Sequence, residues 1–98
     1  MIIKLKILNG LNKGNEFSFD KLPISIGRSN KNDIIINDPY ISRNHCTIYS
    51  ENNFIYICDL NSKNNTYLNN KKINTPQIIN GQDNVIIGKI VIQILIAN

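Results

Sequence analysis

The feature that most constrains this sequence is a series of short segments in which apolar and polar residues alternate. Alternation with a period of two gives a β-strand one buried and one exposed face. The clearest such segments are Ile3 to Leu8, Glu16 to Phe19, Cys46 to Tyr49 and Phe54 to Ile57. The stretch from Asn84 to Ile96 adds a predicted hairpin of two heavily buried strands that turns at Gly88-Lys89.

Turn-forming residues, mostly Asn, Gly and Asp, separate these predicted strands. They include Asn9-Gly10, Asn37-Asp38-Pro39, Glu51-Asn52-Asn53, Asn61 to Asn65, Asn69-Asn70 and Asn80-Gly81. Short strands at this spacing are typical of a β-sandwich or barrel, and no segment of helical period competes with them. The sequence therefore predicts an all-β fold in which residues 1–98 form a single domain.

The charge of the chain limits its partners only weakly. The formal net charge is +4, and the basic residues are dispersed rather than gathered in the run expected of a nucleic-acid tail. Residues 1–6 alternate like a strand and lack the apolar core of a signal peptide, and no segment is long enough to span a bilayer. We expect a soluble, cytoplasmic protein without a membrane partner, and the many Ile, Asn and Lys residues favour a bacterial origin.

The two cysteines, Cys46 and Cys58, lie in separate predicted strands without the CxxC spacing of zinc or redox sites. Two buried thiols are the expected state. If the hairpin between them centres on Asn52, the thiols lie opposite each other, so the sequence leaves a disulfide open. A reducing cytosol disfavours that pairing.

Three turns carry the side chains that indicate a function. Gly27-Arg28-Ser29 follows one predicted strand, Ser42 to His45 precedes another, and Ser62 to Thr66 follows a third. Loops at one end of a sandwich can converge into one site. Their side chains would supply more hydrogen-bond donors than acceptors, including two guanidinium groups and an ammonium group. The predicted ligand is therefore an anion, and a phosphate monoester suits the planar fork of arginine.

Catalysis would require a positioned base or nucleophile, and the sequence does not indicate one. His45 directly precedes a strand, and neither Ser42 nor the cysteines show a triad. His45 also lacks partners at the spacing of metal ligands, which favours a structural role. We predict a binding module that is not an enzyme, with no catalytic residues, no cofactor and no metal.

The order and spacing of these motifs closely resemble the forkhead-associated (FHA) domain. The resemblance covers nearly the whole chain and rests on Gly27-Arg28, Asp33-Ile34, Asp38-Pro39, Ile41 to His45 and Asp59 to Thr66. It implies an antiparallel β-sandwich of about eleven strands whose apical loops, at one end, bind phosphothreonine peptides in extended form.

The resemblance also implies a role for each matching residue. Arg28 is expected to grip the phosphate, Ser42 to donate its hydroxyl to a phosphate oxygen, and Asn64 to hydrogen-bond the peptide backbone. Arg43 and Lys63 are expected to line the same pocket. The structural framework of the site is expected to comprise Gly27, His45, Asn65 and Thr66, with Gly27 allowing a close backbone approach and His45 holding the Ser42 loop.

The chain departs from the family pattern in its turns. The family commonly has Asn-Gly where this chain has Asn64-Asn65 and Asn69-Asn70, so asparagine is expected to adopt the left-handed conformation there. The segment Gly81 to Val85 is one residue longer than its family counterpart, a difference that concerns a local bulge rather than the site.

The predicted function is a phosphothreonine-dependent protein–protein interaction module, an adaptor in Ser/Thr kinase signalling. Its partner would be a phosphothreonine-containing protein, a substrate of such a kinase, and not a nucleic acid. One alternative is an FHA-type scaffold that binds its partner without phosphate, although the intact Arg28, Ser42 and Asn64 argue against it. The other is a small basic β-barrel that binds nucleic acid.

Overall fold

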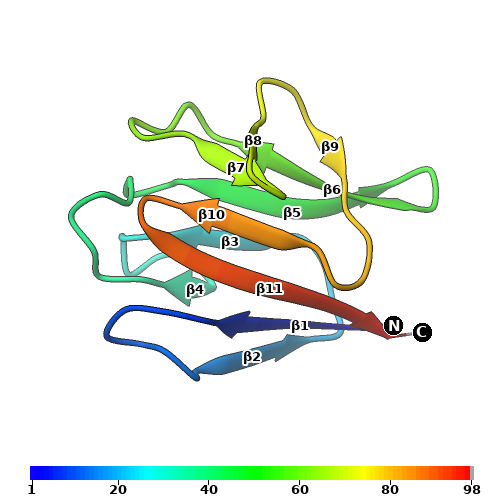
Figure 1. The fold of residues 1–98 in the computed structure, drawn as a ribbon. Helices are drawn as coiled ribbons and strands as arrows, with labels where there is room; N and C mark the ends of the chain where they lie inside the picture. The colour runs from blue at the N-terminus through cyan, green and yellow to red at the C-terminus, as the bar shows by residue number, and fades with distance from the viewer. Residues whose placement is uncertain (98) are drawn as a thin grey trace.

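Eleven strands in two facing sheets make up the regular structure in our computed structural model, which describes residues 1–97 (Figure 1). The strands are β1 (Ile2–Ile7), β2 (Glu16–Phe19), β3 (Ile24–Gly27), β4 (Ile34–Ile35), β5 (Cys46–Glu51), β6 (Phe54–Asp59), β7 (Thr66–Leu68), β8 (Lys71–Lys72), β9 (Gln77–Ile78), β10 (Asn84–Ile87) and β11 (Ile90–Ala97). The predicted all-β sandwich is confirmed. Every regular element in the described part of the chain is a strand, so no helix there has the length and apolarity to cross a membrane.

One sheet has six strands in the order β2-β1-β11-β10-β7-β8, and the other has five in the order β4-β3-β5-β6-β9. All neighbouring pairs are antiparallel except β3 and β4, where Ile26 lies opposite Ile34 in a parallel pair. This edge is a parallel exception in an otherwise antiparallel sandwich. The loop folds back along β3 because the Asp33 carboxylate accepts hydrogen bonds from the Ser25 backbone N–H and hydroxyl.

The core between the sheets consists mainly of isoleucine. In β1, Ile3, Leu5 and Ile7 are buried while the residues between them are exposed. Ile92 and Ile94 in the neighbouring β11 are buried in the same way. Burying one such side chain stabilises a fold by roughly 1.5–3 kcal/mol. The alternation visible in the sequence is therefore the alternation between core and solvent.

The β5–β6 hairpin sets the relation between the two cysteines. Its loop is the residue pair Asn52-Asn53, both left-handed with φ of 51° and 69°, as a two-residue type I′ turn requires. The hairpin therefore centres between these residues and not on Asn52, and Cys58 lies opposite Thr47 rather than Cys46. The condition for opposed thiols is therefore not met, because a shift of one residue sends them to opposite faces of the sheet. Cys46 is buried in the core, Cys58 is half-buried, and both are free.

The two other departures from the family pattern, in the β7–β8 turn and before β10, take the forms expected from the sequence. Asn69 and Asn70 close the β7–β8 hairpin with φ of 48° and 70°, so asparagine replaces glycine in a left-handed turn. Before β10, the Gln82 N–H donates to the Ile94 carbonyl while the Ile94 N–H donates to the Asp83 carbonyl. Gln82 and Asp83 thus both lie opposite Ile94, an arrangement known as a β-bulge. The bulge accommodates the additional residue without changing the rest of the sheet.

The strand directions separate the loops into two groups. The β3–β4, β4–β5 and β6–β7 loops lie at one end of the sandwich, at the left of Figure 1. The β5–β6 hairpin and the ends of the chain lie at the other. The three turns that carry the predicted site residues therefore share one end of the molecule.

Candidate functional site

Backbone hydrogen bonds join the β3–β4 loop to the β4–β5 loop. The Arg28 N–H donates to the Ser42 carbonyl at 3.0 Å, and the Ser29 N–H donates to the Arg43 carbonyl at 3.1 Å. The Arg28 side chain is exposed, and its Nε donates to the Ile41 carbonyl at 3.0 Å. This bond orients the guanidinium, and within residues 1–97 both Nη groups are without an intramolecular partner.

A close backbone approach at Gly27 brings these loops together. A Cβ at Gly27 would lie 2.2 Å from the Arg43 carbonyl oxygen and 2.8 Å from Nδ2 of Asn32. That nitrogen donates to the Arg43 and Ser29 carbonyls at 2.7 and 2.9 Å. Only glycine fits here, and the largely buried Asn32 completes the junction. The sequence reasoning missed Asn32, because nothing in its local pattern distinguishes it from the other turn asparagines.

His45 is fully buried and connects the second loop to the third. The Ser42 N–H donates to its Nδ1 at 3.1 Å, so Nδ1 is the acceptor nitrogen and Nε2 carries the proton. Nε2 then donates to the Asn65 carbonyl at 2.8 Å. The imidazole is thus a bridge with both nitrogens engaged. It is not a base for Ser42, because it contacts the backbone N–H of that residue and not its hydroxyl.

The β6–β7 loop places two polar groups beside Ser42. The Lys63 N–H donates to Ser42 Oγ at 3.0 Å, which leaves the hydroxyl proton available to a ligand. Asn64 Nδ2 donates to the Tyr40 carbonyl at 2.8 Å, which leaves its Oδ1 and second N–H for another partner. Asn65 follows with φ of 69°, the left-handed conformation expected at this position.

Asp59, at the end of β6, organises the base of this loop. It accepts hydrogen bonds from the Ser62 backbone N–H and hydroxyl and from the Thr66 hydroxyl, and Thr66 is fully buried. Burial raises the pKa of Asp59, but these hydrogen bonds outweigh burial and hold the pKa below its ordinary value. The sequence pattern included Asp59 without a role for it. The spacing of three residues between Asp59 and Ser62 was the available signal, since it is typical of loops closed by an Asp side chain.

The structure thus brings all five predicted ligand-binding residues to one end of the sandwich, around the Ser42 loop. The side chains of Arg28, Arg43 and Lys63 are exposed, whereas the carboxylate of Asp59 is engaged within its own loop. Chemically, the arrangement presents positive charge and free donors to solvent, which suits an anion with several acceptor oxygens. In the described residues, no group of three or more His, Cys, Asp and Glu side chains could hold a metal.

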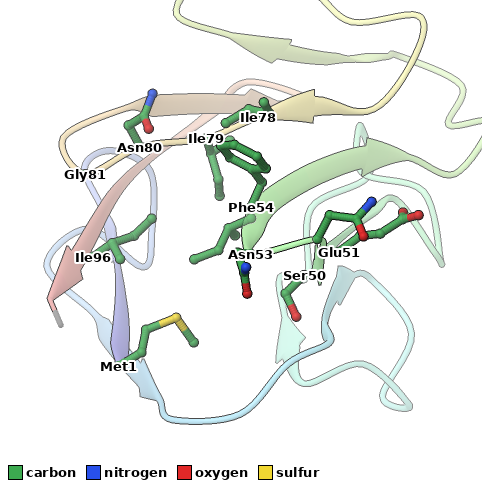
Figure 2. Close-up of a pocket in the computed structure, with 12 residues that line it drawn as sticks. Met1, Ser50, Glu51, Asn53, Phe54, Ile78, Ile79, Asn80, Gly81 and Ile96 are labelled. Carbon is green, nitrogen blue, oxygen red and sulfur yellow. The ribbon is translucent and has the colours of Figure 1, made fainter.

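A separate groove of about 670 Å³ lies at the opposite end of the molecule, beside the β5–β6 hairpin (Figure 2). Its lining is mixed, with apolar side chains such as Met1, Phe54 and Ile78 beside polar ones such as Ser50 and Asn80. Of the described residues that line it, Glu51 is the one with a charged side chain. None of the five predicted ligand-binding residues lines it, so this groove is not the predicted site.

Comparison with known proteins agrees with the fold and with the positions of these loops. The FHA domain family matches residues 24–88, which include all three loops. The glycogen accumulation regulator GarA of Mycobacterium tuberculosis is 36% identical over 85 residues, which is 87% of this chain and 52% of the regulator. An oxoglutarate dehydrogenase inhibitor of Corynebacterium diphtheriae is 31% identical over 85 residues, 87% of this chain and 59% of the inhibitor. The chain therefore spans a little over half the length of these curated relatives.

Solved structures support the same assignment. The FHA domain of a Chlamydia trachomatis protein superposes with a TM-score of 0.89 at 29% identity and covers 100% of both chains. The FHA domain of an Arabidopsis thaliana protein superposes with a TM-score of 0.91 at 26% identity, over 99% of this chain and 86% of that one. The family match extends over most of the chain, and the three loops occupy one end of the same sandwich. This protein belongs to the FHA domain family.

Proposed function

We propose that this chain binds phosphothreonine-containing segments of another protein and acts as a phosphorylation-dependent adaptor. The observation that carries the proposal is the convergence of unpaired donors from Arg28, Ser42 and Asn64 at one end of the sandwich, where Arg28 is exposed and the other two are half-buried. A phosphate monoester carries about two negative charges and three strong acceptor oxygens at neutral pH, which matches such a donor set.

In the proposed complex, each group has a defined task. The two Nη groups of Arg28 bind phosphate oxygens, and the free hydroxyl proton of Ser42 donates to another. Arg43 and Lys63 add positive charge from either side of Ser42. Asn64 uses its Oδ1 and second N–H to bind the ligand backbone, which favours an extended peptide. Gly27, His45, Asn65 and Thr66 hold the loops and do not contact the ligand.

The names of the relatives support a regulatory binding protein rather than an enzyme, since they include a regulator and an inhibitor. One solved relative is the M. tuberculosis protein EmbR in complex with a phosphopeptide. We infer that the ligand of this chain is a cytoplasmic protein phosphorylated by a Ser/Thr kinase. The nucleic-acid alternative depended on an oligonucleotide-binding barrel, and the chain folds instead as an FHA sandwich.

Calorimetric titration with phosphothreonine, phosphoserine and unphosphorylated peptide libraries tests the proposal. Wild type is expected to bind the phosphothreonine library, and Arg28→Ala is expected to weaken binding at least about tenfold, since charge-assisted hydrogen bonds are lost. Arg28→Lys keeps the charge but loses the planar fork, so it should remain weak. Lys4→Ala, on the outer face of β1, removes a charge elsewhere and should bind like wild type.

The phosphate-independent scaffold makes the opposite prediction. A scaffold of that kind would bind an unphosphorylated segment, and its affinity would not change in Arg28→Ala. Equal binding of phosphorylated and unphosphorylated libraries would therefore overturn the proposed function. It would direct attention to the groove of Figure 2 and to the outer faces of the sheets.

A further inference from the structure

A further exposed cation, Lys89, lies on the β10–β11 turn beside the candidate site. Lys89 Nζ is 4.4 Å from the centroid of the Tyr40 ring, within the range of about 6 Å for a cation–π contact. Both side chains are exposed, and Tyr40 retains 48% of its accessible surface. Tyr40 comes from the β4–β5 loop, the same loop that carries Ser42. We call this pair the Tyr40–Lys89 shelf.

The turn under the shelf is held in place by its neighbours. Gly88 is left-handed with φ of 58°, and a Cβ there would approach Tyr40 Cβ and the Tyr40 carbonyl oxygen to 3.2 Å. The Asn9 side chain donates to the Lys89 carbonyl at 2.9 Å and accepts from the Val91 N–H at 2.9 Å. The backbone of Lys89 is therefore fixed relative to Tyr40, and the side chain projects from a defined position.

The shelf is also connected directly to the predicted ligand contacts. The Tyr40 carbonyl accepts the hydrogen bond from Asn64, whose remaining groups are free for the ligand backbone. Tyr40 is two residues before Ser42, the proposed phosphate contact. A peptide that places its phosphate at Ser42 and its backbone at Asn64 therefore has a neighbouring side chain within reach of the shelf.

The chemistry of the shelf favours an acidic side chain. A cation–π contact leaves the Lys89 charge unneutralised, and no hydrogen bond to Lys89 Nζ is present within residues 1–97. The nearby Arg43 and Lys63 add to the positive potential on this end of the molecule, which would repel a basic side chain in the ligand.

We propose that the Tyr40–Lys89 shelf is a specificity element that selects a carboxylate side chain flanking the phosphothreonine. This inference rests on the proposed function of the site. In it, Lys89 contacts the ligand carboxylate, and Tyr40 is a positioning residue that orients the lysine side chain.

The test is a set of phosphothreonine peptides with alanine flanks, in which one aspartate or glutamate is moved through each flanking position. For wild type, we expect an acidic residue at one position to strengthen binding about two- to fivefold, the range of an exposed ion pair. Added salt should reduce this gain. Lys89→Gln should abolish the gain while binding the alanine-flanked peptide with nearly wild-type affinity. Tyr40→Leu should reduce the gain, and Lys4→Gln, the charge-matched control, should retain it.

A second phosphate offers the same chemistry as a carboxylate, so one peptide carries phosphoserine at the selected position. A larger gain from phosphoserine than from aspartate or glutamate would overturn the assignment to a carboxylate. An unchanged acidic preference in Lys89→Gln would overturn the role of the shelf. The two proposals fail separately: absence of phosphothreonine-dependent binding in wild type refutes the function, whereas such binding without an acidic preference refutes this inference alone.

Discussion

Gly27→Ala is the substitution whose effect follows most directly from the structure. The new Cβ would lie 2.2 Å from the Arg43 carbonyl oxygen and 2.9 Å from its carbonyl carbon. These are backbone atoms, and the Asn32 side chain and the Ser29 N–H both donate to that oxygen. The β3–β4 and β4–β5 loops must therefore separate to admit one methyl group.

The magnitude combines two effects. Overpacking of a buried position costs about 1–3 kcal/mol. Weakening the two hydrogen bonds to the Arg43 carbonyl adds about 1 kcal/mol for each bond lost. With one or both bonds lost, we expect Gly27→Ala to lower the free energy of unfolding by about 2–5 kcal/mol, a large share of the roughly 5–15 kcal/mol typical of a domain.

Urea unfolding of wild type, Gly27→Ala and Gly81→Ala measures this effect. Gly81 is the matched control, because a Cβ there would meet only the Ile96 N and O, at an ordinary distance of 3.6 Å. Gly81→Ala should change the free energy of unfolding by no more than about 1 kcal/mol. Gly27→Ala should also bind phosphothreonine peptide more weakly, because it displaces Arg43. Equal unfolding midpoints for the two variants would refute the close-approach argument.

Three further predictions concern a turn, a carboxylate and the ligand. Asn70→Gly should stabilise the protein by up to about 1 kcal/mol, because glycine adopts the left-handed conformation of this position without strain, whereas Asn70→Ala should destabilise it. A higher melting temperature for Asn70→Ala than for Asn70→Gly would contradict the turn geometry. Because the pKa of Asp59 is lowered in the folded protein, the ionised carboxylate stabilises the fold at neutral pH, and this contribution is lost as pH falls below about 4. Asp59→Asn should therefore lose less stability on acidification than wild type. Parallel curves of unfolding free energy against pH for the two proteins would contradict this. Phosphothreonine should bind about fourfold more tightly than phosphoserine if its methyl group is buried, since one buried methylene contributes about 0.8 kcal/mol; equal affinities by calorimetry would exclude that contact.

The strands with clear alternation were predictable to within about two residues, because burial on one face imposes a period of two. Glu16 to Phe19 is β2 itself, and Ile3 to Leu8 differs from β1 by one residue at each end. The two-residue strands β4, β8 and β9 were not predictable as strands, since two residues carry no periodicity. They pair at sheet edges because their neighbours bring them there.

The residues of the candidate site were predictable from ordered motifs, and the contacts among them were not. Ser42 and Lys63 are 21 residues apart, and Gly27 and Arg43 are neighbours only in the folded chain. The contribution of Asn32 follows from this arrangement, because its amide nitrogen reaches two carbonyls that the loops place together.

The sequence by itself determined the fold class, the turns and the chemistry available at each loop, because alternation, left-handed asparagines and cationic side chains are local properties. Only the tertiary structure decided the register of the β5–β6 hairpin, which separates Cys46 from Cys58, and the parallel edge at β4. It also decided which donors remain free, since that depends on hydrogen bonds between residues far apart in the chain. The buried His45 shows the difference most clearly. The sequence shows that a histidine is present, whereas only the fold shows that both of its ring nitrogens are hydrogen-bonded, to the Ser42 N–H and the Asn65 carbonyl.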